Sequence, residues 1–279
     1  LSRVERPARY LNHEWGCAAP VAEGDFAFCM IYPDTYELGQ ANQAVRILVN
    51  AVNAMGGMGA ERAFLPAVDM ADLMREEGVP LFSLESCRPV VDFDVVGITL
   101  PHELAATNVL ETLDLAGIPL RTADRAEGDP IVLAGGPCAY NPEPYAPFFD
   151  VILVGEGEEQ LPEVLALIRE LRASGAPRAD ILREVARRVG GAYVPSLYRW
   201  RSEDEAQAAG SWAEPLFDDV PRVVHKRVFE GFADSPALEP MIVPYTEVVH
   251  DRLNVEILRG CARGCRFCQA GMMYRPVRE

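Results

Sequence analysis

The sequence predicts an α/β fold in which helices cover both faces of a parallel sheet. Two observations predict it. Short, almost continuously apolar segments recur from about residue 20 to residue 175, as in strands that are buried on both faces. Segments with apolar residues at helical spacing separate them, which is the alternation expected of βαβ units. We therefore expect a doubly wound, Rossmann-like domain with a five-stranded parallel sheet, whose ligand binds where the strands end.

Local signals justify each element. Five segments have the length and apolar character of buried strands: 25–32, 62–66, 93–100, 130–136 and 149–155. Segments with helical spacing of apolar residues follow them: 39–57, 70–78, 102–116, 158–174 and 177–189. Pro33 ends the first strand, and Asp69 is a suitable N-cap for the helix that Gly78 terminates.

Beyond residue 190 the pattern changes to short β-prone pieces separated by proline, glycine and acidic residues. The chain is therefore predicted to have four parts: an N-terminal arm (1–19), the α/β domain (20–190), a β-rich connector (191–250) and a C-terminal segment (251–279). In the connector, residues 201–211 are expected to form the solvated tip of a hairpin. The C-terminal segment opens with a predicted strand at 254–260, which leads directly into a cluster of cysteines.

The composition argues against two classes of protein. The formal net charge is −16, whereas broad nucleic-acid binding needs a cationic face. No apolar run approaches the roughly 18 to 20 residues that span a bilayer, and the first residues contain no apolar signal core. We expect a cytoplasmic protein without a membrane partner.

Three of the seven cysteines, Cys261, Cys265 and Cys268, lie close together near the end of the sequence. The other four are scattered: Cys17, Cys29, Cys87 and Cys138. Thiolates are soft ligands that suit zinc, copper(I) or iron–sulfur clusters. Structural zinc and a fully ligated [4Fe–4S] cluster both take four protein ligands, so three thiols leave one metal position open for catalysis. Half of a zinc site and three incidental thiols remain alternatives at this point.

The residues around the cysteines suit an anionic metal cluster. No acidic residue occurs between Ile257 and Arg278. Five arginines accompany the thiols: Arg259, Arg263, Arg266, Arg275 and Arg278. Positive charge lowers the pKa of a thiol and offsets the charge of a cluster. Gly260 and Gly264 let the backbone wrap closely, and Phe267 is placed to shield one side.

The spacing Cys-x3-Cys-x2-Cys after a predicted strand resembles the radical SAM superfamily. The resemblance implies that Cys261, Cys265 and Cys268 hold three irons of a [4Fe–4S] cluster on the loop after the first strand of a TIM-type barrel. The fourth iron would bind S-adenosylmethionine (SAM), and Phe267 stands on the adenine side of that ligand. A reductant such as flavodoxin or ferredoxin would supply the electron that cleaves SAM to a 5′-deoxyadenosyl radical. The substrate and the type of reaction do not follow from the sequence.

The upstream domain resembles the cobalamin (B12)-binding-domain subgroup of that superfamily, and most closely an uncharacterised bacterial family with a B12-binding domain. A Gly-Gly-Pro turn and a Gly-Glu-Gly-Glu run within residues 134–165 carry the resemblance. Many members have Asp-x-His-x-x-Gly after the first strand, where the His is the lower cobalt ligand. Here Asp34, Tyr36 and Gly39 stand at those positions. Because a neutral phenol is a poor cobalt ligand, we expect cobalamin without a His lower ligand, or a domain that has lost it.

Two further groups of residues flank the fourth and fifth predicted strands. Gly135, Gly136 and Cys138 follow the fourth strand, at the edge where ligands bind, and are candidates for a corrinoid loop. A tight turn at the strand exit is the alternative. The acidic run within 155–159 is interpreted as the start of a helix, where carboxylates complement the macrodipole.

The length of the C-terminal segment sets a further expectation. A TIM-type barrel has roughly 200 residues or more, and only about 20 follow the predicted strand at 254–260. We expect a truncated barrel and a fragment that is inactive alone. Two other functions remain open: a substrate- or partner-binding α/β module without corrinoid, and a zinc-stabilised structural domain that adds a distant ligand to the three thiols.

Overall fold

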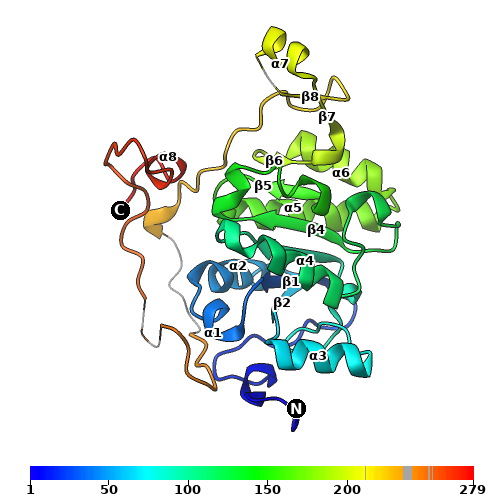
Figure 1. Ribbon diagram of the computed structural model, residues 1–279, viewed down its shortest axis with the longest axis vertical. Coiled ribbons are helices and arrows are strands. Elements are labelled where there is room, and N and C mark those ends of the chain that lie inside the picture. The colour runs from blue at the N-terminus through cyan, green and yellow to red at the C-terminus, as the bar shows by residue number, and fades with distance from the viewer. Residues whose placement is uncertain (211, 235–240, 251, 253) are drawn as a thin grey trace.

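The computed structural model describes residues 1–210, 212–234, 241–250, 252 and 254–279 (Figure 1). Its centre is a six-stranded sheet in the order β2-β1-β3-β4-β5-β6. These strands are β1 (Phe26–Tyr32), β2 (Met58–Phe64), β3 (Val95–Thr99), β4 (Ile131–Gly135), β5 (Val151–Leu153) and β6 (Ala192–Tyr193). The first five are parallel, and β6 pairs antiparallel with β5. The prediction of an α/β fold with five parallel strands is confirmed. The structure places β6, which was expected in the connector, at the edge of the same sheet.

Helices cover both faces of this sheet. In the described residues the α-helices are α1 (Tyr36–Gly39), α2 (Gln43–Asn53), α3 (Val68–Glu77), α4 (Ala106–Leu115), α5 (Gly157–Ala173), α6 (Arg178–Arg188), α7 (Glu203–Ala209) and α8 (Ala270–Met273). Helices α2, α5 and α6 share a core with Phe28 and Met30 of β1. Helices α3 and α4 share the other core with Cys29 and Ile31. Strand β1 is therefore buried on both faces, which explains its continuous apolar sequence.

Strand β2 begins at Met58, earlier than the predicted range of 62–66. The predicted start was too late because Gly59 and Glu61 interrupt the apolar pattern, although both residues are buried in the strand. The helix predicted over 39–57 is shorter in the structure: α2 covers Gln43–Asn53, and the separate helix α1 ends at Gly39. Asn42 separates them, because its side chain accepts a 3.3 Å hydrogen bond from the backbone N–H of Val45 and caps α2.

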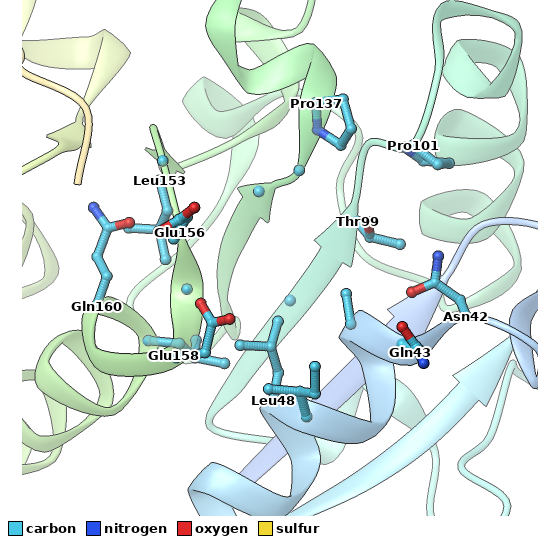
Figure 2. A pocket seen from close by; sticks show the side chains of 18 of the residues that line it. Asn42, Gln43, Leu48, Thr99, Pro101, Pro137, Leu153, Glu156, Glu158 and Gln160 are labelled. Atoms are coloured by element: carbon cyan, nitrogen blue, oxygen red, sulfur yellow. The ribbon is translucent and has the colours of Figure 1, made fainter. Parts of the chain in front are cut away.

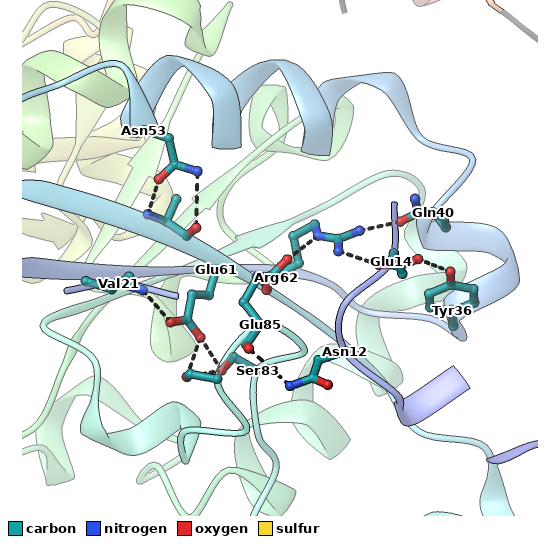
Figure 3. Close-up of polar contacts among 12 residues, drawn as sticks. Asn12, Glu14, Val21, Tyr36, Gln40, Asn53, Glu61, Arg62, Ser83 and Glu85 are labelled. Carbon is teal, nitrogen blue, oxygen red and sulfur yellow. Dashed lines mark hydrogen bonds and ion pairs between the residues drawn. The ribbon is translucent and has the colours of Figure 1, made fainter. Parts of the chain in front are cut away.

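A buried polar network surrounds Arg62 and attaches the N-terminal arm to β2 (Figure 3). The Arg62 guanidinium donates hydrogen bonds of 2.5 Å to Glu14 of the arm and 2.6 Å to Glu85. A third, also 2.6 Å, goes to the side-chain oxygen of Gln40. Glu14 also accepts a hydrogen bond from the Tyr36 hydroxyl. The exposed fraction of the Arg62 side chain is only 1%, so its charge depends on these partners rather than on water.

A second buried ion cluster lies where strands β4 and β5 begin. One carboxylate oxygen of Asp150 accepts hydrogen bonds of 2.8 Å from Arg125 and 2.7 Å from Arg178. The same oxygen accepts a 2.8 Å bond from the backbone N–H of Val132 in β4. Arg125 also donates 2.7 Å to the carbonyl of Phe148. These contacts join the loop before β5, the start of β4 and the start of α6.

A small hairpin projects from the α/β domain, as Figure 1 shows. It consists of the antiparallel strands β7 (Tyr198–Trp200) and β8 (Ala213–Pro215). The predicted hairpin tip at 201–211 contains helix α7, because Ser202 and Glu205 form a capping box at its start. Residues 211, 235–240, 251 and 253, which belong to the predicted connector and C-terminal segment, lie outside the described residues. The four predicted domain boundaries stay predictions.

The strand predicted at 254–260 is not formed in the part of this segment that the structure describes. Val255 and Ile257 are 68% and 79% exposed, and no described strand lies beside them to complete a ladder. A lone strand leaves its backbone groups unpaired and is unstable in water. The first strand of the predicted TIM-type barrel is therefore absent from the described residues. None of the described helices has the length and apolar character needed to span a membrane.

Candidate functional site

A cavity of about 830 Å³ opens at the carboxyl ends of the parallel strands. It lies over β1, β3 and β4, where the chain order of the sheet reverses, which is the usual ligand position in such folds. Figure 2 shows side chains from α2 and from the start of α5 turned toward this space. Its walls are largely apolar and include Leu48 of α2 and Leu161 of α5. The side chains of Asn42, Gln43 and Gln160 add amide groups.

Of the predicted corrinoid-loop residues, the structure brings Gly135 and Gly136 to this cavity. Gly136 has a φ of 104°, and a Cβ there would lie 3.1 Å from the carbonyl oxygen of Leu100. This position is therefore both a tight strand-exit turn and part of the cavity wall. Cys138 is buried behind the turn, where burial raises the pKa of its thiol, and it does not line the cavity.

The segment with the Asp-x-Tyr-x-x-Gly spacing lies elsewhere. Asp34, Tyr36 and Gly39 are not among the residues that line the cavity. The Tyr36 ring packs edge-on against Phe64, with ring centroids 5.5 Å apart. Burial, together with the hydrogen bond to Glu14, raises the pKa of the Tyr36 hydroxyl. Tyr36 thus belongs to the network that attaches the N-terminal arm, and it stays a neutral phenol.

The three clustered cysteines lie on a surface loop. Cys265 is exposed, Cys261 and Cys268 are half-buried, and none of them forms a disulfide. The backbone N–H of Cys268 donates a 3.1 Å hydrogen bond to the carbonyl of Cys265. In the residues that the structure describes, no three His, Cys, Asp or Glu side chains are close enough together to hold a metal ion. The donor chemistry fits a cluster with three thiolate ligands, and the loop would have to close around it.

Phe267 lies on the same loop with its side chain 92% exposed. No described residue buries its ring, so the ring is available to a bound molecule beside the thiols. An apolar aromatic ring in water is stabilised when a ligand covers it.

The cysteine loop, defined here as residues 259–278, is closed at its base. The backbone N–H of Arg259 donates 2.9 Å to the carbonyl of Arg278, and the N–H of Arg278 donates 2.9 Å in return. Two further contacts hold the loop near α8. The Tyr140 hydroxyl donates 3.0 Å to the carbonyl of Met273, and Lys226 Nζ donates 2.9 Å to the same carbonyl. Segments far apart in the sequence therefore hold the loop beside the cavity.

Two carboxylates at the start of α5 bind the arginines at the loop base. Arg259 Nη1 lies 2.6 Å from Glu158 Oε1 and 3.6 Å from Glu156 Oε1. Arg278 donates 2.6 Å and 2.5 Å hydrogen bonds to the two oxygens of Glu156. These four side chains are only 11–14% exposed. Glu156, Glu158 and Arg259 also line the cavity.

Local backbone geometry explains where Glu156 lies. Gly155 has a φ of 122° and pairs with Arg227, so that a Cβ at Gly155 would lie 2.2 Å from the Arg227 carbonyl oxygen. Only glycine suits this position. Burial acts to raise the pKa of Glu156, but the hydrogen bond from Arg278 and the charge of Arg259 outweigh it and hold that pKa below its ordinary value.

The acidic run at 155–159 was interpreted from the sequence as a helix start alone, and that interpretation missed its role. The run does begin α5, yet Glu156 and Glu158 bind arginines that lie about a hundred residues further along the chain. One signal in the sequence could have indicated this role: an acidic run occurs in the same chain as a cysteine segment that is rich in arginine and free of acidic residues, and opposite charges attract.

Comparison with known proteins now assigns a family. The family model described as "Radical SAM proteins, N-terminal" matches residues 44–195, which is more than half of the chain. The chain belongs to this family. The matched region of this radical SAM N-terminal protein runs from α2 through β6 and includes most of the sheet and the acidic start of α5.

Two individual proteins are similar to this member of the radical SAM N-terminal family. An uncharacterised protein of Methanocaldococcus jannaschii, MJ0966, is 25% identical over 252 residues, which cover 89% of this chain. The chain spans 42% of the length of that relative. The solved structure of TsrM from Kitasatospora setae, a radical S-adenosylmethionine methyltransferase with cobalamin and a [4Fe-4S] cluster bound, is 17% identical. It has a TM-score of 0.35 and covers 56% of this chain and 28% of its own, a similarity too low to establish a common fold.

Proposed function

We propose that this chain is part of a radical SAM enzyme and that Cys261, Cys265 and Cys268 are the ligands of its [4Fe–4S] cluster. One observation carries the proposal. In a chain of the radical SAM N-terminal family, the Cys-x3-Cys-x2-Cys loop is anchored beside the cavity of the α/β domain. When bound, the cluster would supply the electron that cleaves SAM reductively to a 5′-deoxyadenosyl radical, with flavodoxin or ferredoxin as the reductant.

The residues of the loop prepare it for this chemistry. Arg263, Arg266 and Arg275 place positive charge on the cysteine loop, which would offset the negative charge of an iron–sulfur cluster. The exposed ring of Phe267 offers an apolar surface for the adenine of SAM. Free thiols and a reduced cluster need a reducing compartment, which supports a cytoplasmic location.

The cavity of the α/β domain is the proposed site of a second, larger ligand. Its volume of about 830 Å³ falls in the range of about 300–1,000 Å³ that is typical of small-molecule sites. Mostly apolar walls with a few amide groups suit a corrinoid or part of a substrate. A corrinoid in this cavity would bind without a His lower ligand, because the described residues that line it include no histidine. A substrate- or partner-binding module without corrinoid is the second candidate.

Anaerobic reconstitution with iron and sulfide tests the cluster. We expect the wild-type chain to take up about four irons and to develop the brown absorption of a cluster. Cys265→Ala should lose most of this iron, because two thiolates do not hold a [4Fe–4S] cluster. Cys87→Ala removes another exposed cysteine and is the matched control, which should keep the iron. Stoichiometric zinc with no uptake of iron by the wild type would instead support a zinc-stabilised structural domain.

Titration with hydroxocobalamin, followed by its absorbance, tests the cavity. Leu48 lines the cavity on α2, so Leu48→Trp should fill part of it and weaken binding at least about tenfold. Leu38→Trp introduces the same ring at an exposed position outside the cavity and should leave the affinity unchanged. Binding that is equal in both variants, or absent from the wild type, would favour the module without corrinoid.

A further inference from the structure

We infer that Glu156 and Glu158 are positioning residues, which hold the base of the cysteine loop against the cavity by binding Arg259 and Arg278. The presence of a [4Fe–4S] cluster on the loop rests on the proposed function, whereas the positioning of the loop rests on contacts within this chain. The inference concerns two carboxylates that contact neither the thiols nor any proposed ligand of the iron.

Glu156 is the central residue because both ends of the loop meet it. It binds Arg278 through both carboxylate oxygens, and Arg259 lies 3.6 Å from one of them. Since the backbones of Arg259 and Arg278 are also hydrogen-bonded to each other, one side chain fixes the entry and the exit of the loop together. A bidentate arginine–carboxylate pair sets direction as well as distance.

The neighbouring connector reinforces this arrangement. The backbone N–H of Phe229 donates 2.6 Å to Glu156, and the Phe229 carbonyl accepts 2.7 Å from Arg278. The Arg259 guanidinium also lies over the ring of Phe232, 5.1 Å from its centroid. The ion pairs are thus shielded from water on one side, which makes them stronger than freely exposed pairs.

The same groups connect the loop to the cavity. Glu156 and Glu158 line it from α5, and Arg259, Gly260 and Tyr274 line it from the loop side. Any movement of the loop base therefore changes the cavity wall. The distance between a cluster on the loop and a ligand in the cavity depends on these ion pairs, and such distances decide whether bound groups can react.

Hydrogen exchange of the whole chain measures the positioning without any cofactor. The backbone amides of Arg259 and Arg278 are protected only while the loop base is closed, so their exchange reports its opening. Glu156→Gln keeps the shape of the side chain and removes its charge. It should speed exchange of these two amides by about 10- to 100-fold. The Glu156 side chain makes no cap hydrogen bond to α5, so the helix should keep its start.

Glu159→Gln is the matched control. Glu159 lies in the first turn of α5, close to Glu156 in sequence, and carries the same charge. Its carboxylate is half exposed and, among the described residues, pairs with Arg227 at 3.6 Å. This variant should leave exchange at the loop base unchanged. Arg278→Gln removes the pair from the loop side and should reproduce the effect of Glu156→Gln. In each variant the amides of β3 and β4 should exchange as in the wild type, and they serve as the reference for folding.

A spectroscopic measurement separates positioning from stability. At equal iron content, the electron paramagnetic resonance spectrum of the reduced cluster should change in Glu156→Gln and stay unchanged in Glu159→Gln. Glu156→Asp, which retains the charge, should restore part of the protection of the loop base. Unchanged exchange in both Glu156→Gln and Arg278→Gln, or equal acceleration in Glu159→Gln, would overturn the inference. Absence of iron uptake by the wild type would overturn the proposed function and leave the exchange result standing.

Discussion

Replacing Asp150 with alanine is expected to lower the free energy of unfolding by about 3–5 kcal/mol. Its carboxylate binds Arg125 and Arg178 at 2.8 and 2.7 Å, and the Arg125 and Asp150 side chains are 0% and 2% exposed. The substitution leaves two guanidinium groups near each other with no carboxylate between them. It also removes the partner of the Val132 N–H, so a backbone donor of β4 is left unsatisfied.

Urea unfolding measures the change. Asp219→Ala is the control, because Asp219 also binds two arginines, Arg183 at 2.8 Å and Arg187 at 3.1 Å, but at the surface. Solvent and salt screen such pairs, so this variant should unfold close to the wild-type urea midpoint. Equal losses for the two variants would show that burial does not decide the contribution of Asp150.

Replacing Arg62 with methionine should have an effect of similar size, about 3–5 kcal/mol. The guanidinium is almost fully buried and neutralises Glu14 and Glu85. Burial already raises the pKa of Glu85 despite the charge of Arg62, so loss of that charge should push the carboxyl toward its protonated form. The arm should also detach, because Glu14 would lose its strongest partner.

Unfolding in urea and limited proteolysis of the arm measure both effects. A triple variant that combines Arg62→Met with Glu14→Gln and Glu85→Gln removes the unpaired charges and should recover part of the stability. Arg75→Met, which removes an exposed arginine bound to Glu111 and Asp114, is the control and should leave the arm attached. A stable Arg62→Met protein with an intact arm would contradict the expectation.

The sequence predicts the α/β domain well where burial is continuous. Strands β1, β3 and β4 follow from apolar runs such as Phe26–Tyr32, since a strand covered on both faces has no polar positions. The start of strand β2 was misplaced because Glu61 is buried as a hydrogen-bonded side chain, whereas a hydropathy pattern predicts that a charged residue is exposed. Strand β6 has two residues, too few to show any periodicity.

The candidate site could be predicted only in part, for a different reason. The spacing of Cys261, Cys265 and Cys268 is local and visible in the sequence, and their assignment as cluster ligands stays a prediction. The ion pairs from α5 to the loop base join residues about a hundred positions apart, and a single sequence does not show which charges meet. The prediction of a strand at 254–260 was wrong because a strand needs a neighbouring strand to pair with. Local sequence preference does not show whether such a neighbour is present.

The reactivity of the Lys226 amine can be used to measure whether the cysteine loop is closed. It is the only lysine in the sequence, and its ammonium donates hydrogen bonds to the carbonyls of Met273 and Arg275 in the cysteine loop. An acylating reagent attacks the free amine, so a side chain engaged by two carbonyls is protected from it. The rate at which this side chain is acylated therefore reports how often the loop leaves Lys226, and no other lysine of the given sequence competes for the reagent.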